Sequence, residues 1–532
     1  MPTLRPSALF VLLTLAASYS IAVPMPQDNV TPAPELTSKA SPDASQRQRV
    51  VIVQPVVLHD DDGSNAAPLS LPKQLVDRVY TKADVEFLYL PTRHWNYGEG
   101  RRGEVNLNTI VAAGHKNGMI CKDPRIETLL FVSSVDGQEG PLGRGLQNGN
   151  VCFVCLGPTP DQNDPAMEAF VVAHEVGHCL NLKHSVDDPR VPNDLINLQG
   201  DGPFDQRLAI DGLHDTQRDT VLASPLVNER IRFLARDEAA RQLVDETWEP
   251  YLSNAHPDML RFVLGLTPST NLPKGAKAQL QFARQEHGDF AAEFTEEERE
   301  LLRERVTELQ RLVGGDWPLL TRLPWNFIKV NDGFCRGMPH TRGLSTVLGP
   351  RALAKIKSDP TYALTLLLHE KLHVVERISP EVFEALYRSY GFQPIEMDPA
   401  SVASLNLAQN PDALSLNWAI PVDGSLCLLA TTIAPEGDEL VFVEKLRTLE
   451  KQPSGLFTAG SEVDLEKLDE FKQRFAVRTG HDHPNEIAAY LAEHLLRTDY
   501  LGLEIETTAA AAPQVEATRA AFKKILGDIG PR

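Results

Sequence analysis

The spacing of apolar residues predicts that the first part of the chain alternates strands with helices. The apolar run from Val50 to Leu58 is interrupted only by Gln54 and Pro55, which is typical of a buried strand beginning at Arg49. A helix is predicted at 72–81. Further strands are predicted at three places: 85–90, 128–133 and 151–156. Strands and helices in this order favour an α/β domain.

The pattern becomes helical and strongly charged at 226–320, where we expect a helical spacer with solvated charges. The chain has 532 residues, and one hydrophobic core supports only roughly 250–300. We therefore expect two domains separated by this spacer. The sequence predicts a first domain at 49–225, a second domain at 321–505, and a tail with a short amphipathic helix at 506–532.

The N-terminal residues have the features of an export signal. Arg5 precedes an apolar run of about ten residues, and the small residues Ser20 and Ala22 would stand at positions −3 and −1 of a cleavage site. The run is too short to span a bilayer. We predict a signal peptide at 1–22, a flexible leader rich in Pro, Ser and Thr at 23–48, and a secreted, extracellular protein.

Net charge and cysteine content narrow the class of protein. A net charge of −20 opposes binding to phosphate backbones and anionic lipids, so we expect neither nucleic acid nor a membrane as partner. Each half of the chain contains an even number of the six cysteines, which favours disulfides formed inside each half. The pair Cys152 and Cys155 has no second such pair, as a zinc ribbon would need. The cysteines are Cys121, Cys152, Cys155, Cys179, Cys335 and Cys427.

A helical segment at 167–180 carries the first cluster of metal-binding residues. It places His174 and His178 one turn apart on one face, where both imidazoles can reach a single ion. A catalytic zinc ion takes three protein ligands, and His184 supplies the third if the chain turns back after the helix. That turn needs a left-handed residue at 181, where Asn181 is the commonest substitute for Gly.

The carboxylate of Glu175, beside the first ligand, is the expected general base toward water activated by zinc. The string from His174 to His184, HEVGHCLNLKH, resembles the metzincin signature in every position but Asn181, where metzincins have Gly. The resemblance implies that its three histidines hold zinc. Metzincins also have a methionine turn beneath the metal, and here Ile196 stands where that methionine is expected.

A second segment with the same spacing lies at 361–377. It places His369 and His373 one turn apart, with Glu370 in the position of the base. No histidine follows at the distance seen in the first motif, so the third ligand must come from elsewhere. The best candidate is Glu486, which opens a later helix. Two other carboxylates stay open as alternative ligands: Glu376 and Glu493.

The set of two histidines and one glutamate resembles the gluzincin arrangement, in which a carboxylate from a second helix completes the zinc shell. The two resemblances imply an α+β/α/β protein with two zinc-metallopeptidase domains. These are a metzincin-like domain at 49–225 and a gluzincin-like domain at 321–505, each with a mixed sheet and an HExxH active-site helix, joined by the helical spacer. The implied cofactors are two zinc ions, one per domain.

These features favour a secreted zinc endopeptidase that hydrolyses protein or peptide substrates at two sites. Two alternatives remain: a zinc amidohydrolase acting on non-peptide amides, and a binding protein built on inactive metallopeptidase scaffolds. Intact base positions at Glu175 and Glu370 speak against the binding protein, which has no need of them. The sequence leaves substrate preference and oligomeric state open.

Overall fold

The computed structural model describes most of the chain beyond residue 46. The described residues are 47–135, 137–138, 141–157, 165–192, 197–200, 212–248, 251–405, 410–412, 417–463, 475, 483–505, 507–509 and 511–527. The predicted signal peptide, nearly all of the predicted leader and Ile196 lie outside them, so these expectations stay predictions.

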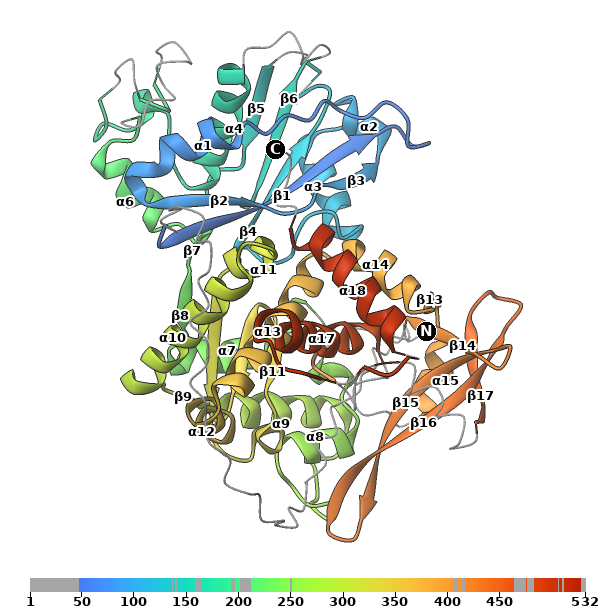
Figure 1. The fold of residues 1–532 in the computed structure, drawn as a ribbon. Coiled ribbons are helices and arrows are strands. Elements are labelled where there is room, and N and C mark those ends of the chain that lie inside the picture. The colour runs from blue at the N-terminus through green and yellow to red at the C-terminus, as the bar shows by residue number, and fades with distance from the viewer. Residues whose placement is uncertain are drawn as a thin grey trace.

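A seven-stranded mixed sheet forms the centre of the first body, drawn from blue to green in Figure 1. The apolar run after Arg49 forms its central strand β1, and every residue from Val50 to Leu58 is buried. Strand β1 has parallel partners on both sides, which explains the continuous burial. The strands are β1 (Arg49–His59), β2 (Val85–Tyr89), β3 (Arg93–Asn96), β4 (Ile126–Phe131), β5 (Pro141–Gly145), β6 (Val151–Leu156) and β7 (Val227–Glu229).

Helices cover both faces of this sheet. Val51 and Val53 of β1 pack with α1 and α4 on one face, and Val56 and Leu58 pack with α3 on the other. The sheet therefore holds α4, which carries the first motif, as a rigid element. The helices of this body are α1 (Lys73–Val79), η1 (Tyr80–Ala83), α2 (Gly98–Arg101), α3 (Leu107–Lys116), α4 (Pro165–Cys179), η3 (Ser185–Asp187) and α6 (Asp215–Leu222).

The second body contains a five-stranded mixed sheet whose central strand β10 has parallel partners β8 and β12. Helix α13, which carries the second motif, is buried almost continuously along its C-terminal half. The strands are β8 (Ile231–Phe233), β9 (Ala291–Ala292), β10 (Trp325–Val330), β11 (His340–Arg342) and β12 (Ser345–Leu348). Helices before α13 are α7 (Arg236–Leu243), η4 (Leu252–Asn254), α8 (Pro257–Val263), α9 (Ala276–Asp289), α10 (Glu296–Val313), α11 (Pro318–Arg322), η5 (Phe334–Gly337) and α12 (Pro350–Ser358).

A third, antiparallel sheet lies beside the second body, in orange in Figure 1, and was not predicted. Its strands are β13 (Gln393–Pro394), β14 (Trp418–Val422), β15 (Ser425–Glu436), β16 (Glu439–Lys451) and β17 (Phe457–Glu462). The remaining helices are α13 (Pro360–Ile378), α14 (Pro380–Ser389), α15 (Pro399–Ser404), α17 (Pro484–Leu495), η6 (Leu496–Tyr500) and α18 (Ala512–Ile525). In the part of the chain that the structure describes, no helix combines the length and apolar character needed to cross a membrane.

The fold is a mixed α/β protein, as predicted, but the two bodies are not joined by a purely helical spacer. Region 226–320 contributes β7 to the first sheet and both β8 and β9 to the second. These strands have two or three residues each, too short for a period of two to stand out among helices. The domain boundaries themselves stay predictions.

The two bodies share one apolar core. Ile52, Leu88 and Ile126 of the first sheet belong to the same buried cluster as Leu320 and Trp325 of the second body. Ion pairs cross the same junction: Glu86 with Arg230 and Arg322, and Arg93 with Glu381 at 2.8 Å.

The structure contradicts the predicted disulfides, because no disulfide joins any of the six cysteines, all of which lie among the described residues. Cys335 and Cys427 lie in different apolar clusters, so the two second-half cysteines do not meet. Cys152 and Cys155 face opposite sides of the first sheet. Burial accounts for these positions, since free cysteine is among the most buried residue types.

Candidate metal centres

The end of helix α4 positions the first candidate site. The helix stops at Cys179, and Asn181 adopts a left-handed conformation with φ of 70°. This confirms the predicted turn. The backbone N–H of Leu182 donates to the carbonyl of Gly177 at 2.8 Å, which closes the turn and sends the chain back toward the helix. His184 is thereby returned to the face that carries His174 and His178.

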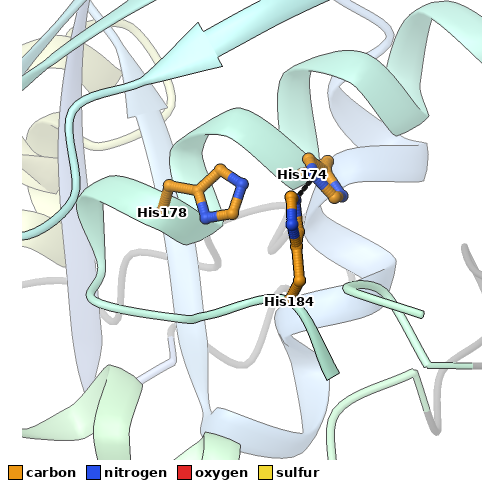
Figure 2. Close-up of side chains that lie close together, drawn as sticks. All are labelled: His174, His178 and His184. Carbon is orange, nitrogen blue, oxygen red and sulfur yellow. Dashed lines mark hydrogen bonds between the residues drawn. The ribbon is translucent and has the colours of Figure 1, made fainter. Parts of the chain in front are cut away.

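The three histidines converge on one point, as Figure 2 shows. The Nε2 atoms of His174 and His184 are 3.2 Å apart. The ring centroid of His178 is 4.8 Å from that of His174 and 4.8 Å from that of His184. One potential ligand atom from each ring lies within 4.8 Å of the others. Three converging imidazole nitrogens suit zinc, which accepts three protein ligands and keeps one position for a reactant.

Backbone carbonyls fix the orientation of two of these rings. His174 Nδ1 lies 3.1 Å from the carbonyl oxygen of Leu198, and His178 Nδ1 lies 2.8 Å from that of Leu182. A carbonyl can only accept, so each Nδ1 carries the proton and each Nε2 keeps its lone pair for a metal. Burial also lowers the pKa of His178, which favours the neutral ring. Both rings therefore have the tautomer that a zinc ligand needs.

Glu175 sits beside the histidines and under strand β5. Burial raises the pKa of its carboxyl to about 7, partly opposed by the N–H of Gly145, which donates to Oε2 at 2.6 Å. A Cβ at Gly143 would lie 2.4 Å from Glu175 Cγ, and one at Gly145 would lie 2.2 Å from its carbonyl oxygen. Glycine at both positions lets the strand approach the helix this closely. Neither glycine belongs to the motif that predicted this site.

The first site opens into a cavity of about 720 Å³. Its walls combine the motif with the edge strand and the segment after the helix, including Leu142, Arg144, Gln147, Lys183 and Asp187. The side chain of His184 is 47% exposed, so molecules in solution can reach the three histidines. The arrangement can hold a metal ion and place a substrate next to Glu175.

The second candidate site joins two helices of the second body. His369 and His373 come from α13, and Glu486 comes from the first turn of α17, so it opens a later helix as predicted. His369 Nε2 is 3.5 Å from Glu486 Oε2, and His373 Nε2 is 3.6 Å from Glu486 Oε1. The sequence-predicted ligands are therefore brought together.

The two alternative ligands, Glu493 and Glu376, contact the outer nitrogens of the histidines. Glu493 Oε1 accepts from His369 Nδ1 at 2.9 Å, and Glu376 Oε2 accepts from His373 Nδ1 at 3.1 Å. Both carboxylates thus hold the outer nitrogens and turn Nε2 of each ring toward Glu486. Carboxylates in that position orient the ring and increase its basicity.

The inner atoms of the second site are buried polar groups without protein partners. His369 Nε2, His373 Nε2 and Glu486 Oε2 have no hydrogen-bond partner among the described residues, although each of these side chains is at most 4% exposed. Buried polar atoms are rarely left unpaired, and a bound cation would satisfy all three. Two nitrogens and a carboxylate form a donor set that fits zinc.

The charges around His369 also favour a bound cation at the second site. Burial lowers its pKa, but Glu486 and Glu493 outweigh that effect and hold the pKa well above its ordinary value. Burial lowers the pKa of His373 to about 3. A divalent cation would replace the positive charge that the two carboxylates favour on His369.

The second site is enclosed. Glu370 is 2% exposed, and burial, together with the charges of Asp412 and Glu486, raises its pKa well above the usual range. A cavity of about 440 Å³ reaches His373 and is lined also by Tyr387, Trp418 and His483. The lining of this cavity does not include Glu370.

The chain matches no family model and none of the curated proteins. Two archaemetzincins are among the solved structures that are similar to about a third of the chain. Archaemetzincin from Methanopyrus kandleri has 16% identity and a TM-score of 0.23, with coverage of 33% of this chain and 94% of the archaemetzincin. Archaemetzincin from Archaeoglobus fulgidus, complexed with malonate, has 15% identity, a TM-score of 0.21 and coverage of 32% and 99%.

The function has to be argued from the chemistry of the sites, because a fold does not determine an activity. Sequence reasoning found the side chains that converge in both sites. It missed three other groups that orient them: the carbonyls of Leu198 and Leu182, and Asn410, which donates to Glu486 Oε1 at 2.7 Å. Backbone carbonyls have no sequence signal, and Asn410 lies far from either motif.

Proposed function

We propose that this chain is a zinc-dependent peptidase that hydrolyses peptide bonds at the first site. The observation that carries the proposal is the convergence of three imidazoles beside Glu175 at an open cavity. The predicted signal peptide supports an extracellular place of action.

A zinc ion held by His174, His178 and His184 would supply Lewis acidity to the scissile carbonyl. Glu175 is the base. Its Oε2 accepts from the N–H of Gly145, so Oε1 is the oxygen that takes a proton from water and returns it to the departing amine.

Strand β5 supports a peptide as the substrate. It is the last strand in the order of its sheet and lines the cavity through Leu142, Gly143 and Arg144. An extended peptide can add to such an edge as a further strand, and its backbone then lies across the zinc ligands. A small non-peptide amide would gain nothing from this edge, which favours the peptidase over the amidohydrolase.

We propose a second zinc ion at His369, His373 and Glu486. The unpartnered inner atoms support binding of the ion, and Glu370 supplies a base position. Its burial makes this site the lesser contributor to cleavage of long substrates.

The test is the zinc content of the purified full-length protein after rinsing with a chelator. We expect one ion in each of these two sites, so that His174→Ala and His369→Ala each lower the zinc content by about one ion per chain. Casein and a set of non-peptide amides are then offered to the zinc-loaded protein. Cleavage of casein that is lost in His174→Ala supports the proposal, and cleavage that persists at full rate contradicts it.

A further inference from the structure

A third cluster of metal-binding side chains lies in the first body, away from both sites described above. Glu127, Cys152 and Cys179 each present a ligand atom within 4.8 Å of the other two. All three side chains are buried, with Glu127 and Cys152 at 0% and Cys179 at 1% exposure.

Three separate elements bring these residues together. Glu127 comes from β4 and Cys152 from β6, and the two strands are neighbours in which Leu129 pairs with Cys152. Leu129 and Glu127 point to the same face of the sheet, because residues two apart in a strand do so. Cys179 is the last residue of α4, which packs on that face.

The carboxylate of Glu127 is buried without the partners that a buried carboxylate usually has. Neither of its oxygens has a hydrogen-bond partner among the described residues. The polar groups around it include the thiols of Cys179 and Cys152 and the phenol of Tyr80. An ionisable side chain that is fully buried is nearly always paired or bound to a metal. This one faces two cysteines, whose sulfurs are among the preferred ligands of zinc.

We propose that Glu127, Cys152 and Cys179 form a third metal site, which holds a thiophilic divalent cation of the zinc type between the first sheet and the end of α4. Two sulfurs and a carboxylate oxygen supply three protein donors, all of kinds that zinc accepts. The cluster is fully enclosed and has no base beside it, so its role is structural.

The cluster lies where the end of α4 meets the first sheet. Cys179 follows His178 directly, and its Sγ lies 3.3 Å from the carbonyl oxygen of Val151 on β6. A cation at this point would fasten the C-terminal end of α4 to β4 and β6. It would thereby fix the position of His178. The turn through Asn181 then brings His184 close to His178.

Cobalt provides a test, because its bonds to thiolates absorb in the near ultraviolet and its bonds to imidazole and carboxylate do not. The full-length protein is freed of metal and titrated with Co²⁺. We expect a thiolate absorption that is lost in Cys152→Ser and in Cys179→Ser. Cys155→Ser is the matched control: it lies on the same strand, faces the other side of the sheet, and should keep the absorption. His174→Ala should keep it as well, which separates this site from the proposed peptidase site.

Glu127→Gln tests the carboxylate and guards against variants that fail to fold. It keeps the shape of the side chain, and should weaken cobalt binding at the thiolates by more than the roughly 10- to 100-fold loss expected for an outer-shell partner. Cobalt that fills the histidine sites without any thiolate absorption would overturn the proposal. So would a disulfide between Cys152 and Cys179, found by thiol labelling of the freshly purified, unreduced protein.

Discussion

The two HExxH helices present histidines in the same way but complete their metal sites in opposite ways. The first site takes His184 from the turn that follows its own helix and opens to a large cavity. The second takes Glu486 from another helix, and the carboxylates of Glu493 and Glu376 accept hydrogen bonds from its two histidines. The first is built for access, and the second for firm ligand orientation. The same short motif therefore indicates a metal site, while access to solvent has to be read from the fold.

The largest expected effect is a difference in peptidase activity between variants of the two base positions, Glu175 and Glu370. Glu175→Gln should lower kcat/KM for casein-derived peptides by about 10²–10⁴-fold, because the variant cannot accept the proton from water. Glu370→Gln should leave most of this activity, since Glu370 is buried away from the open cavity. The measurement is peptide hydrolysis with zinc content checked for each variant. Equal losses in the two variants would break the distinction between the sites.

A second prediction concerns the close approach of β5 to α4. In Gly145→Ala the new Cβ would lie 2.2 Å from the carbonyl oxygen of Glu175 and 2.7 Å from His178 Cβ, so strand and helix must separate. A displacement of this kind should cost about 100-fold in peptide hydrolysis. Gly315→Ala is the control, because a Cβ there meets no atom within 4 Å. An active Gly145→Ala protein would mean that β5 does not help to position the base.

The carboxylates behind the second site offer a third test. Glu493→Gln removes the charge that orients His369 and should weaken zinc binding about 10- to 100-fold. Competition with a chromogenic chelator in a His174→Ala background measures this site without the first. Glu384→Gln, a change at an exposed ion pair with Arg388, should leave zinc affinity unchanged. If both variants bind zinc equally well, the outer carboxylate has no orienting role.

The smallest effect concerns acid stability of the second body. Burial lowers the pKa of both His287 and His340 to about 3, below the ordinary 6.5. The unfolded chain therefore binds more protons than the folded chain between these values. Stability contributed by each neutral ring is complete above pH 6.5 and is lost as the pH falls toward 3, at about 1.4 kcal/mol per pH unit.

Hydrogen exchange at pH 7 and pH 5 should show this loss first in α9, which carries His287, and in β11, which carries His340. A protein carrying His287→Gln and His340→Gln should have a shallower dependence of unfolding free energy on pH. An unchanged slope would exclude these rings as the source.

Local patterns were enough to predict the first site almost completely. Its ligands lie within eleven consecutive residues, and the left-handed Asn181 links them by a geometry that a residue type can indicate. Strand β6 was predicted with its observed bounds, and β1 began where expected. These elements are buried on both faces, so their sequences are continuous and distinctive.

Features that depend on distant partners were not predictable in the same way. Strands β8 and β9 exist because β10 lies beside them, and two or three residues carry no period of their own. The third sheet has long strands, but many residues of β16 are only half-buried, which blurs the alternation. An even cysteine count suggested disulfides, although only the fold shows which thiols face each other.

The apolar cluster shared by the two bodies limits how this molecule can be divided. Ile52, Leu88 and Ile126 depend on the second body for their shelter from water. A fragment ending near residue 225 would lose β7 from its sheet and expose those side chains together. The halves are thus not interchangeable modules. A descendant of this protein that lost one metal centre would still need the body around that centre, because the other body would not stay soluble and folded without it.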